Sequence, residues 1–353
     1  MRILDSPGLY ASLDPTGLLE RMQELPRHCE VAWSQAKALY IPEGWTQIDK
    51  VVICGMGGSA IAGDLVADLA SSQETVPVLV VRDFRLPCHV DQCSLAIVCS
   101  YSGNTEETLS LYRQAVRDNA RVLVVAGGGW LAEDATARGI PLLRLDIPGE
   151  PRGAVGYILM LLLGALHRLG LMKTTEQDLQ AMVDAVRQQA SRLEGKVLTR
   201  DNPAKQLALA LEAKIIAVYG GGVFSGVARR WKTQFNENAK AWAFFEVIPE
   251  MLHNSVEAFR AVPGMGDKVA ALLLQPSGGP EGLQKRFPVV LEMLGQGNIS
   301  CQVLRGIDGP SLAEVMAMLS LGDHVSYYLA LLNGVNPSPT PAIDSGKARL
   351  ANP

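Results

Sequence analysis

Short apolar runs that alternate with helical segments constrain the fold of the first half of the chain. They occupy residues 51–54, 78–81, 95–99, 122–125 and 142–145. A continuous apolar run of this length is typical of a strand buried on both faces, and its alternation with helices predicts a parallel sheet with helices on both sides. We therefore predict an α/β fold whose ligands bind at the carboxyl ends of the strands.

A second copy of this pattern begins near residue 213. Residues 213–228 repeat the order of residues 49–62, in which an apolar strand is followed by a glycine turn and a helix. The offset of about 165 residues predicts two copies of one fold. The expected division of the chain is a helical arm over 1–45, a first domain over 46–170, a helical linker over 171–205, a second domain over 206–335 and a C-terminal tail over 336–353.

The composition limits the classes of function and of partner. Hydrophobic residues make up 48% of the 353 residues and charged residues 19%, as in a globular protein. A net charge of −4 argues against a nucleic-acid partner. The most apolar stretch, 154–166, is too short to span a bilayer and the start of the chain lacks a signal peptide, so we expect no membrane partner. The six cysteines form no CxxC or zinc-like spacing, which favours a reducing cytoplasm and no metal.

The turn after the first strand has two interpretations. Residues 55–60 fit the G-x-G-x-x-A pattern of dinucleotide-binding turns, and Asp83 stands where a ribose-binding acid lies in that fold. Gly57, Gly58 and Ser59 can equally serve a sugar or a phosphate, because glycine permits close approach of the backbone. The turn after the third strand favours a sugar phosphate over an oxidoreductase cofactor, because a nicotinamide-binding fold does not require such a turn.

Residues 100–108, with the sequence SYSGNTEET, join the third strand to a helix. Ser100, Ser102 and Thr105 place three hydroxyls around the flexible Gly103, and the backbone N–H groups of the helix start lie beside them. A helix start of this kind attracts anions, phosphate above all. Helix capping is the alternative, but one such side chain is enough for a cap. We therefore predict a phosphate site at this turn.

The second copy carries polar residues of a different kind. Only Ser255 stands near the region expected to correspond to the phosphate turn, so we predict one anion site per chain, in the first half. Glu237 falls in a predicted helix, 231–240, whose aromatic neighbours Trp231, Trp242, Phe244 and Phe245 indicate burial. Burial raises the pKa of a carboxyl group and suits it to act as a general base. His253 is either a structural or a catalytic histidine, and the sequence favours neither.

Arg152 stands directly before the apolar helix, two residues after Glu150. A cation at a helix start meets the unfavourable end of the helix dipole. Arg152 therefore either pairs with a carboxylate such as Glu150 or faces the ligand, and the sequence leaves both possibilities open. From spacing alone, Lys347 near the end of the chain is an ordinary surface lysine.

Several motifs together resemble one family. The segments are GMGGSAIAGDL at 55–65, SYSGNTEET at 100–108, PRGAVGY at 151–157, RWKTQFNENAK at 230–240, PEMLHN at 249–254 and YYLALLNGVNPSPTPAID at 327–344. SYSGNTEET is typical of sugar isomerase (SIS) domains, and NENAK followed by HN narrows the resemblance to the bifunctional phosphoglucose/phosphomannose isomerase family. The resemblance implies two tandem SIS domains, each a parallel sheet flanked by helices on both faces.

The resemblance also implies an activity and a catalytic set. The implied enzyme is an aldose–ketose isomerase that interconverts glucose 6-phosphate and mannose 6-phosphate with fructose 6-phosphate through a cis-enediol, with no metal and no cofactor. Glu237 matches the base that moves the proton between C1 and C2, and Arg152 matches the arginine that stabilises the enediolate. His253, supplied across a homodimer interface, and Lys347 match residues that open the sugar ring.

The implied substrate-binding set lies in the first half of the chain. Gly57, Gly58 and Ser59 match a sugar-contacting loop, and the phosphate is held by Ser100, Ser102 and Thr105. In the tail, Ser338 or Thr340 is a candidate contact for O2 or O3 of the sugar. The alternative function is a non-catalytic sugar-phosphate sensor, because SIS domains also serve that purpose, although no basic DNA-binding segment is evident.

Overall fold

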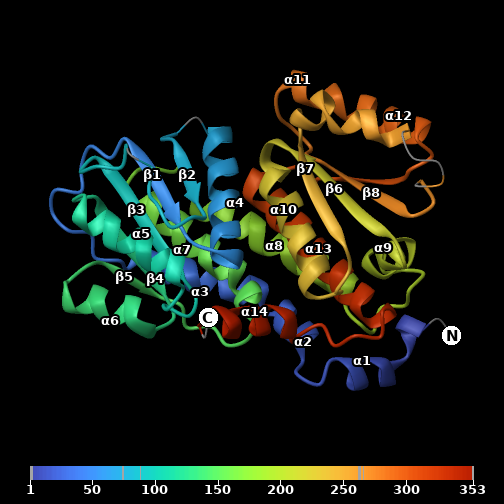
Figure 1. Ribbon diagram of the computed structural model, residues 1–353, viewed down its shortest axis with the longest axis horizontal. Coiled ribbons are helices and arrows are strands. Elements are labelled where there is room, and N and C mark those ends of the chain that lie inside the picture. Colours follow the sequence, from blue (N-terminus) through green and yellow to red (C-terminus); the bar gives the residue numbers. More distant parts are fainter. Residues whose placement is uncertain (1–2, 74, 88, 261–263, 265, 352–353) are drawn as a thin grey trace.

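The computed structural model describes residues 3–73, 75–87, 89–260, 264 and 266–351, and it contains two parallel sheets joined by helices (Figure 1). The first sheet has five strands in the order β2-β1-β3-β4-β5 and the second has four in the order β7-β6-β8-β9. The predicted α/β fold is therefore confirmed. Helices α4 (Gly57–Gln73) and α10 (Ser225–Glu237) lie between the two sheets and pack against each other.

The first sheet contains each strand that the apolar runs predict. Its strands are β1 (Lys50–Cys54), β2 (Val78–Val81), β3 (Ser94–Ser100), β4 (Arg121–Ala126) and β5 (Leu142–Arg144). Side chains alternate between the faces of a strand. Val52 packs with α5 (Glu106–Arg117) and α6 (Gly129–Ala137), and Ile53 packs with α4 and α7 (Val155–Arg168). Helices thus cover both faces. Strands β1, β3 and β4 are buried as predicted, whereas the edge strands β2 and β5 are only partly buried.

The second sheet repeats this arrangement. Its strands are β6 (Ile215–Gly221), β7 (Ala243–Ile248), β8 (Val269–Gln275) and β9 (Ser300–Arg305). Helices α10 and α13 (Ser311–Leu332) cover one face, and α12 (Arg286–Gln296) covers the other. The repeat predicted from the glycine turn at the end of β6 is correct.

The strand orders correct one expectation about this repeat. Matching β2-β1-β3-β4 to β7-β6-β8-β9 makes β8 the counterpart of β3. The turn that corresponds to residues 100–105 is therefore the loop after β8, where Ser277 lies. Ser255 instead begins the 3-10 helix η5 (Ser255–Arg260), which follows β7. The prediction that Ser255 marks the corresponding region was wrong, because β8 had not been recognised as a strand.

The long apolar helix α13 lies in the shared core and is buried along most of its length. Helix α13 is long and apolar enough to cross a membrane by length and composition, and 89% of its most apolar window is buried inside the structure, as in a core helix. It packs against α8 (Glu176–Leu193) and α9 (Pro203–Leu211). His324 is buried in α13, where its Nδ1 lies 2.8 Å from the Ser320 carbonyl oxygen.

The N-terminal arm contains η1 (Ile3–Asp5), α1 (Pro7–Leu13), α2 (Leu18–Gln23) and α3 (Leu25–Lys37). Lys205 of α9 is fully buried and holds the start of the arm in place. Its Nζ donates hydrogen bonds of 2.8 Å to the carbonyl oxygen of Leu4 in the arm and to that of Gly195. Asp5 Oδ1 lies 3.3 Å from the same nitrogen.

At the other end of the chain, α14 (Pro341–Ala351) is exposed along residues 341–350. Helix α11 (Glu281–Gln284) and the short helices η2 (Pro151–Ala154), η3 (Gly222–Phe224) and η4 (Glu250–His253) complete the described elements.

Candidate functional site

The turn after β3 is held in shape by the glycine turn after β4. Gly103 has a φ of +70°, and a Cβ placed on it would lie 1.7 Å from the Gly128 carbonyl oxygen. The Leu131 N–H donates to the Gly103 carbonyl oxygen at 3.0 Å, and the Trp130 N–H donates to Asn104 Oδ1 at 3.0 Å. Only glycine fits at position 103, because both the backbone conformation and the available space exclude a side chain.

The hydroxyls predicted to hold a phosphate gather at this turn. Ser100 is buried, its Oγ accepts a hydrogen bond from the Gly103 N–H at 3.0 Å, and it lies 3.1 Å from Thr105 Oγ1. Ser102 is exposed, and its Oγ accepts from the Asn104 N–H at 3.3 Å. Thr105 occupies the N-cap position of α5 without a capping hydrogen bond from its side chain. The capping alternative therefore does not account for Thr105, and the start of α5 keeps N–H groups suited to an anion.

The first glycine turn connects this region to Arg152. Gly55, at the beginning of this turn, lies close to β3, because a Cβ on Gly55 would be 3.0 Å from the Cys99 carbonyl oxygen. A Cβ on Gly58 would lie 3.1 Å from the Pro151 carbonyl oxygen and 3.4 Å from the Arg152 Cα. The turn thus needs glycine for a close backbone approach to the Arg152 segment. Ser59 is buried at the beginning of α4.

Arg152 is buried, and most of its donors are bound by the protein. Its Nε donates to Asn238 Oδ1 at 2.7 Å, and its Nη2 donates to the carbonyl oxygens of Pro337 and Ser338, both at 2.7 Å. Its Nη1 lies 3.9 Å from Glu237 Oε2. Burial lowers the pKa of Arg152, and the Glu237 carboxylate partly offsets that effect. The ion pair of Arg152 is therefore with Glu237 and not with Glu150.

The residues after Glu237 complete this cluster. Asn238 is buried and also donates from Nδ2 to Ser326 Oγ at 3.0 Å. Lys240 Nζ donates to the carbonyl oxygens of Glu237 at 2.7 Å and of Asn336 at 3.0 Å. Burial and the charge of Arg152 lower the pKa of Lys240 to about 8. The sequence analysis did not single out Asn238 or Lys240, although both belong to the NENAK motif.

Glu237 is less enclosed than predicted. Its side chain is 27% exposed. Trp231 is fully buried, but Trp242 and Phe244, counted among the burying neighbours, are 72% and 54% exposed. The two rings stack edge to face beside the edge strand β7 and point away from the core. The prediction that aromatic side chains bury Glu237 is therefore wrong for Trp242 and Phe244. Glu237 is held instead by its place at the end of α10 and by its ion pair with Arg152.

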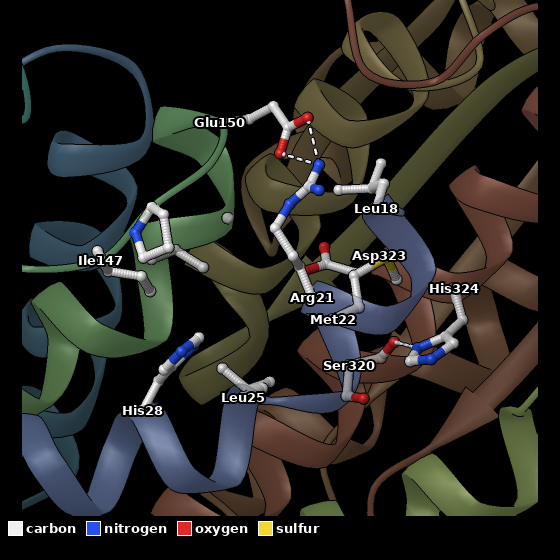
Figure 2. Close-up of a pocket in the computed structure, with 13 residues that line it drawn as sticks. Leu18, Arg21, Met22, Leu25, His28, Ile147, Glu150, Ser320, Asp323 and His324 are labelled. Atoms are coloured by element: carbon white, nitrogen blue, oxygen red, sulfur yellow. Dashed lines mark hydrogen bonds and ion pairs between the residues drawn. The ribbon is translucent and has the colours of Figure 1, made fainter. Parts of the chain in front are cut away.

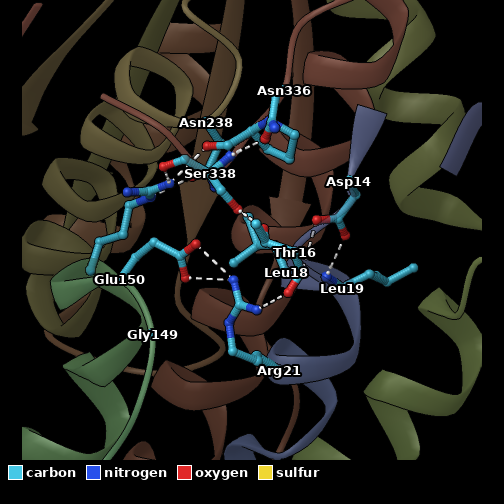
Figure 3. A network of polar contacts seen from close by, with 12 residues as sticks. Asp14, Thr16, Leu18, Leu19, Arg21, Gly149, Glu150, Asn238, Asn336 and Ser338 are labelled. Atoms are coloured by element: carbon cyan, nitrogen blue, oxygen red, sulfur yellow. Dashed lines mark hydrogen bonds and ion pairs between the residues drawn. The ribbon is translucent and has the colours of Figure 1, made fainter. Parts of the chain in front are cut away.

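The C-terminal tail contacts the N-terminal arm close to Glu150 (Figure 3). Thr16 Oγ1 lies 2.7 Å from Ser338 Oγ, and the Ser338 N–H donates to Asn336 Oδ1 at 2.9 Å. Arg21 Nη2 donates to both carboxylate oxygens of Glu150, at 2.7 and 2.8 Å. The Ser338 hydroxyl, predicted as a contact for the sugar, is thus bonded to the arm.

A narrow pocket lies under the Arg21–Glu150 pair, between the arm, the segment before α7, and α13 (Figure 2). His28 lines it from α3, and Asp323 and His324 line it from α13. Burial lowers the pKa of His28. The His28 side chain is half-buried in this wall. The arm therefore forms one wall of this pocket, and residues on both sides of Arg152 form another.

Two predicted residues lie outside this cluster. His253 is exposed at the end of η4, which follows β7, and Lys347 is exposed in α14. In the part of the chain that the structure describes, no hydrogen bond or ion pair joins either of them to Arg152 or Glu237. A single copy of the chain therefore brings together Arg152 and Glu237, but not His253 and Lys347.

The described residues show no group of three or more His, Cys, Asp or Glu side chains that could hold a metal ion. The cysteines among them, Cys29, Cys54, Cys93, Cys99 and Cys301, are all free thiols. Cys88 lies outside the described residues.

Solved structures and a family model define the class of protein. The fold is similar to hypothetical protein TT0462 from Thermus thermophilus, with a TM-score of 0.74, 16% identity, and coverage of 98% of this chain and 92% of that one. A glucose-6-phosphate isomerase like protein from the same organism has a TM-score of 0.64 at 22% identity, covering 96% and 99%. Residues 200–350 match the bacterial phospho-glucose isomerase C-terminal SIS domain. The two sheets and the motifs thus define a double-SIS protein.

Sequence relatives narrow this class to a family. The chain is 32% identical over 335 residues to the bifunctional phosphoglucose/phosphomannose isomerase of Caldicellulosiruptor bescii, covering 95% of this chain and 99% of the relative. It is 29% identical over 330 residues to the protein of the same name from Aquifex aeolicus, covering 93% and 99%. The chain belongs to the bifunctional phosphoglucose/phosphomannose isomerase family, as the motifs predict.

Proposed function

We propose that this chain interconverts glucose 6-phosphate and mannose 6-phosphate with fructose 6-phosphate, as an aldose–ketose isomerase. The observation that carries the proposal is the pair formed by Arg152 and Glu237. Arg152 Nη1 lies 3.9 Å from the Glu237 carboxylate, while Nε and Nη2 are bound by protein acceptors. A fixed cation whose Nη1 faces a partly exposed carboxylate suits a reaction that moves a proton and builds up negative charge.

In the proposed reaction, the Glu237 carboxylate removes the proton from C2 of the open-chain aldose. The electrons form the C1–C2 double bond of a cis-enediolate, and Arg152 Nη1 stabilises its negative charge. The proton of the O2 hydroxyl moves to O1, and the protonated Glu237 returns its proton to C1, so that C2 becomes the carbonyl carbon of the ketose. Glucose 6-phosphate and mannose 6-phosphate differ only in configuration at C2, so both reach the same enediolate.

We propose that the phosphate binds at Ser100, Ser102 and Thr105, and that the first glycine turn contacts the sugar. Strands β1 and β3 are neighbours with Cys54 opposite Val98, so the two turns lie at the same edge of the sheet. Gly58 then packs against the backbone of Arg152. This continuous series of contacts supports one substrate site that extends from the phosphate turn to Glu237. We also propose that the predicted division of the chain holds, with the phosphate site in 46–170 and Glu237 in 206–335.

We propose that His253 and Lys347 act on the substrate in a homodimer, with His253 supplied by the second copy. Both side chains are exposed in one copy. Trp242 and Phe244 offer an exposed apolar surface on the edge strand β7, as protein interfaces commonly do.

Mixing two inactive variants tests the homodimer proposal. In a dimer of one His253→Ala chain and one Glu237→Gln chain, one site has both residues intact if His253 crosses the interface. Random mixing should then restore about a quarter of wild-type activity. If His253 serves its own chain, mixing restores no activity.

A coupled assay tests the activity itself. Purified protein is incubated with fructose 6-phosphate and EDTA, and glucose 6-phosphate and mannose 6-phosphate are measured separately. The proposal predicts that both form. If neither forms while sorbitol 6-phosphate, which cannot be isomerised, still binds, the chain is a sugar-phosphate sensor and not an isomerase.

A further inference from the structure

We infer that the N-terminal arm is part of the working site, with Thr16 and Arg21 as positioning residues for Arg152. The inference rests on the proposed function for its kinetic consequences, but its structural basis is independent of that function. Neither residue touches Arg152. Each acts through a group that lies beside it, and both come from the short segment around the start of α2 (Figure 3).

The first connection passes through the tail. Thr16 Oγ1 lies 2.7 Å from Ser338 Oγ, across 322 residues of sequence. The Ser338 carbonyl oxygen accepts a 2.7 Å hydrogen bond from Arg152 Nη2. Ser338 therefore contacts the arm through its side chain and Arg152 through its backbone. Displacing the Ser338 side chain moves an acceptor that fixes the Arg152 guanidinium.

The second connection passes through the segment before Arg152. Arg21 Nη2 donates to both carboxylate oxygens of Glu150, at 2.7 and 2.8 Å, and hydrogen bonds between charged groups are stronger than those between neutral groups. The side chain also packs on the backbone, since a Cβ on Gly149 would lie 3.0 Å from Arg21 Nε. Arg21 Nη1 donates to the Thr16 carbonyl oxygen, which joins the two connections.

The arm itself is fixed where these contacts begin. Asp14 accepts hydrogen bonds from the N–H groups of Leu18 at 2.8 Å and Leu19 at 3.0 Å, and thereby caps the start of α2. Tyr327 of the core helix α13 donates to the same carboxylate at 3.1 Å. Thr16 and Arg21 are thus presented from a rigid base, as a positioning role requires.

The requirement for positioning follows from the donors of Arg152. Only Nη1 faces Glu237, so a rotation of the guanidinium turns the useful nitrogen away while Arg152 stays folded in place. Displacements of about 1 Å in such an arrangement can lower a rate about a hundredfold. The loss falls on stabilisation of the transition state, and so on kcat more than on KM.

Substitutions at Thr16 test the first connection. We expect Thr16→Val to lower kcat about tenfold with KM for fructose 6-phosphate changed less than about twofold, and Thr16→Ser to restore kcat because it keeps the hydroxyl. In a Ser338→Ala background, Thr16→Val should have no further effect, because the partner hydroxyl is already absent. An unchanged kcat in Thr16→Val, or a full additional loss in the double variant, would overturn the inference.

Arg21→Gln tests the second connection and keeps the inference testable if a Thr16 variant fails to fold. We expect the same selective loss of kcat. The matched control is Arg27→Gln, which removes an exposed ion pair of the arm with Glu24, away from Arg152. A loss of kcat in the control equal to that in Arg21→Gln means that the arm contributes only stability, and would overturn the inference.

Hydrogen–deuterium exchange separates this inference from the proposed function. Exchange of the backbone amides of Asn336, Ser338 and Thr340 should be faster in Thr16→Val than in wild-type protein and unchanged in Thr16→Ser, while the prolines at 337 and 339 carry no amide hydrogen. This readout does not need catalysis, so it stands even if the wild-type chain is not an isomerase. Equal exchange in all three proteins would show that Thr16 does not hold the tail.

Discussion

Replacing Gly103 with alanine should disrupt the phosphate turn specifically. Gly103 has a φ of +70°, and the added Cβ would lie 1.7 Å from the Gly128 carbonyl oxygen and 2.7 Å from the Gly128 carbonyl carbon. Both atoms belong to the backbone, so no side chain can rotate out of the way. Either the turn at 100–105 or the turn at 127–129 must move by more than about 1 Å to restore a normal contact.

The expected loss of stability in Gly103→Ala has two parts. The positive φ costs about 1–2 kcal/mol for a residue with a side chain, and forced repacking costs about 1–3 kcal/mol more. The matched control is Gly139→Ala, because Gly139 has a φ of +66° and no atom within 4 Å of the added Cβ. Gly139→Ala should therefore show only the first part, in urea unfolding of both variants.

Binding of sorbitol 6-phosphate, measured by calorimetry, is the functional assay. We expect Gly103→Ala to weaken binding at least about tenfold, or about 1.4 kcal/mol, because the N–H of residue 103 and the Ser100 hydroxyl move together. Gly139→Ala should bind like the wild-type protein. Wild-type affinity in Gly103→Ala, or an equal loss in the control, would refute the assignment of this turn to the phosphate.

Three further predictions concern stability. Burial raises the pKa of Asp68 to about 7, so the folded state binds a proton that the unfolded state has lost, and stability falls as pH rises from about 4 to about 7. Asp68→Asn should remove that fall, so that between pH 5 and pH 8 the variant gains about 3 kcal/mol relative to wild type in urea unfolding. Gly322→Ala should lower the free energy of unfolding by about 1–3 kcal/mol, because the added Cβ would lie 2.2 Å from Trp231 Nε1. Its control is Gly295→Ala, which should raise the free energy of unfolding by up to about 1 kcal/mol, because the added Cβ lies in open space within a helix. Lys205→Met should lower the free energy of unfolding by about 3 kcal/mol in the same assay, because it removes the buried donor that the Leu4 and Gly195 carbonyl oxygens share.

The sequence predicts well those features that local signals encode. Strands β1 and β3 follow from their apolar runs, and the turn at 100–105 follows from hydroxyls and a glycine at a strand–helix junction. Gly103 and Gly58 occupy positions where the backbone demands glycine, which is why the two turns were recognisable.

The remaining features depend on contacts between distant parts of the chain. Arg152 and Asn238 are 86 residues apart, and Thr16 and Ser338 are 322 apart. No local sequence pattern indicates that the residues of either pair are in contact. The choice between Glu150 and the ligand as the partner of Arg152 was open for the same reason.

The environment of Glu237 was mispredicted for a related reason. Aromatic residues near it in sequence indicated burial, yet Trp242 and Phe244 lie beside an edge strand and face outward. Which face of a strand is covered depends on the strand order, and the composition of a segment does not reveal that order.

The central claim is that Glu237 moves a proton between C1 and C2, and solvent exchange tests it most directly. Wild-type protein and Glu237→Gln are incubated with fructose 6-phosphate in D₂O, and deuterium at C1 is measured by NMR. We predict incorporation by the wild-type protein and none by Glu237→Gln, with sorbitol 6-phosphate still bound by both. Exchange by Glu237→Gln at the wild-type rate would contradict the account.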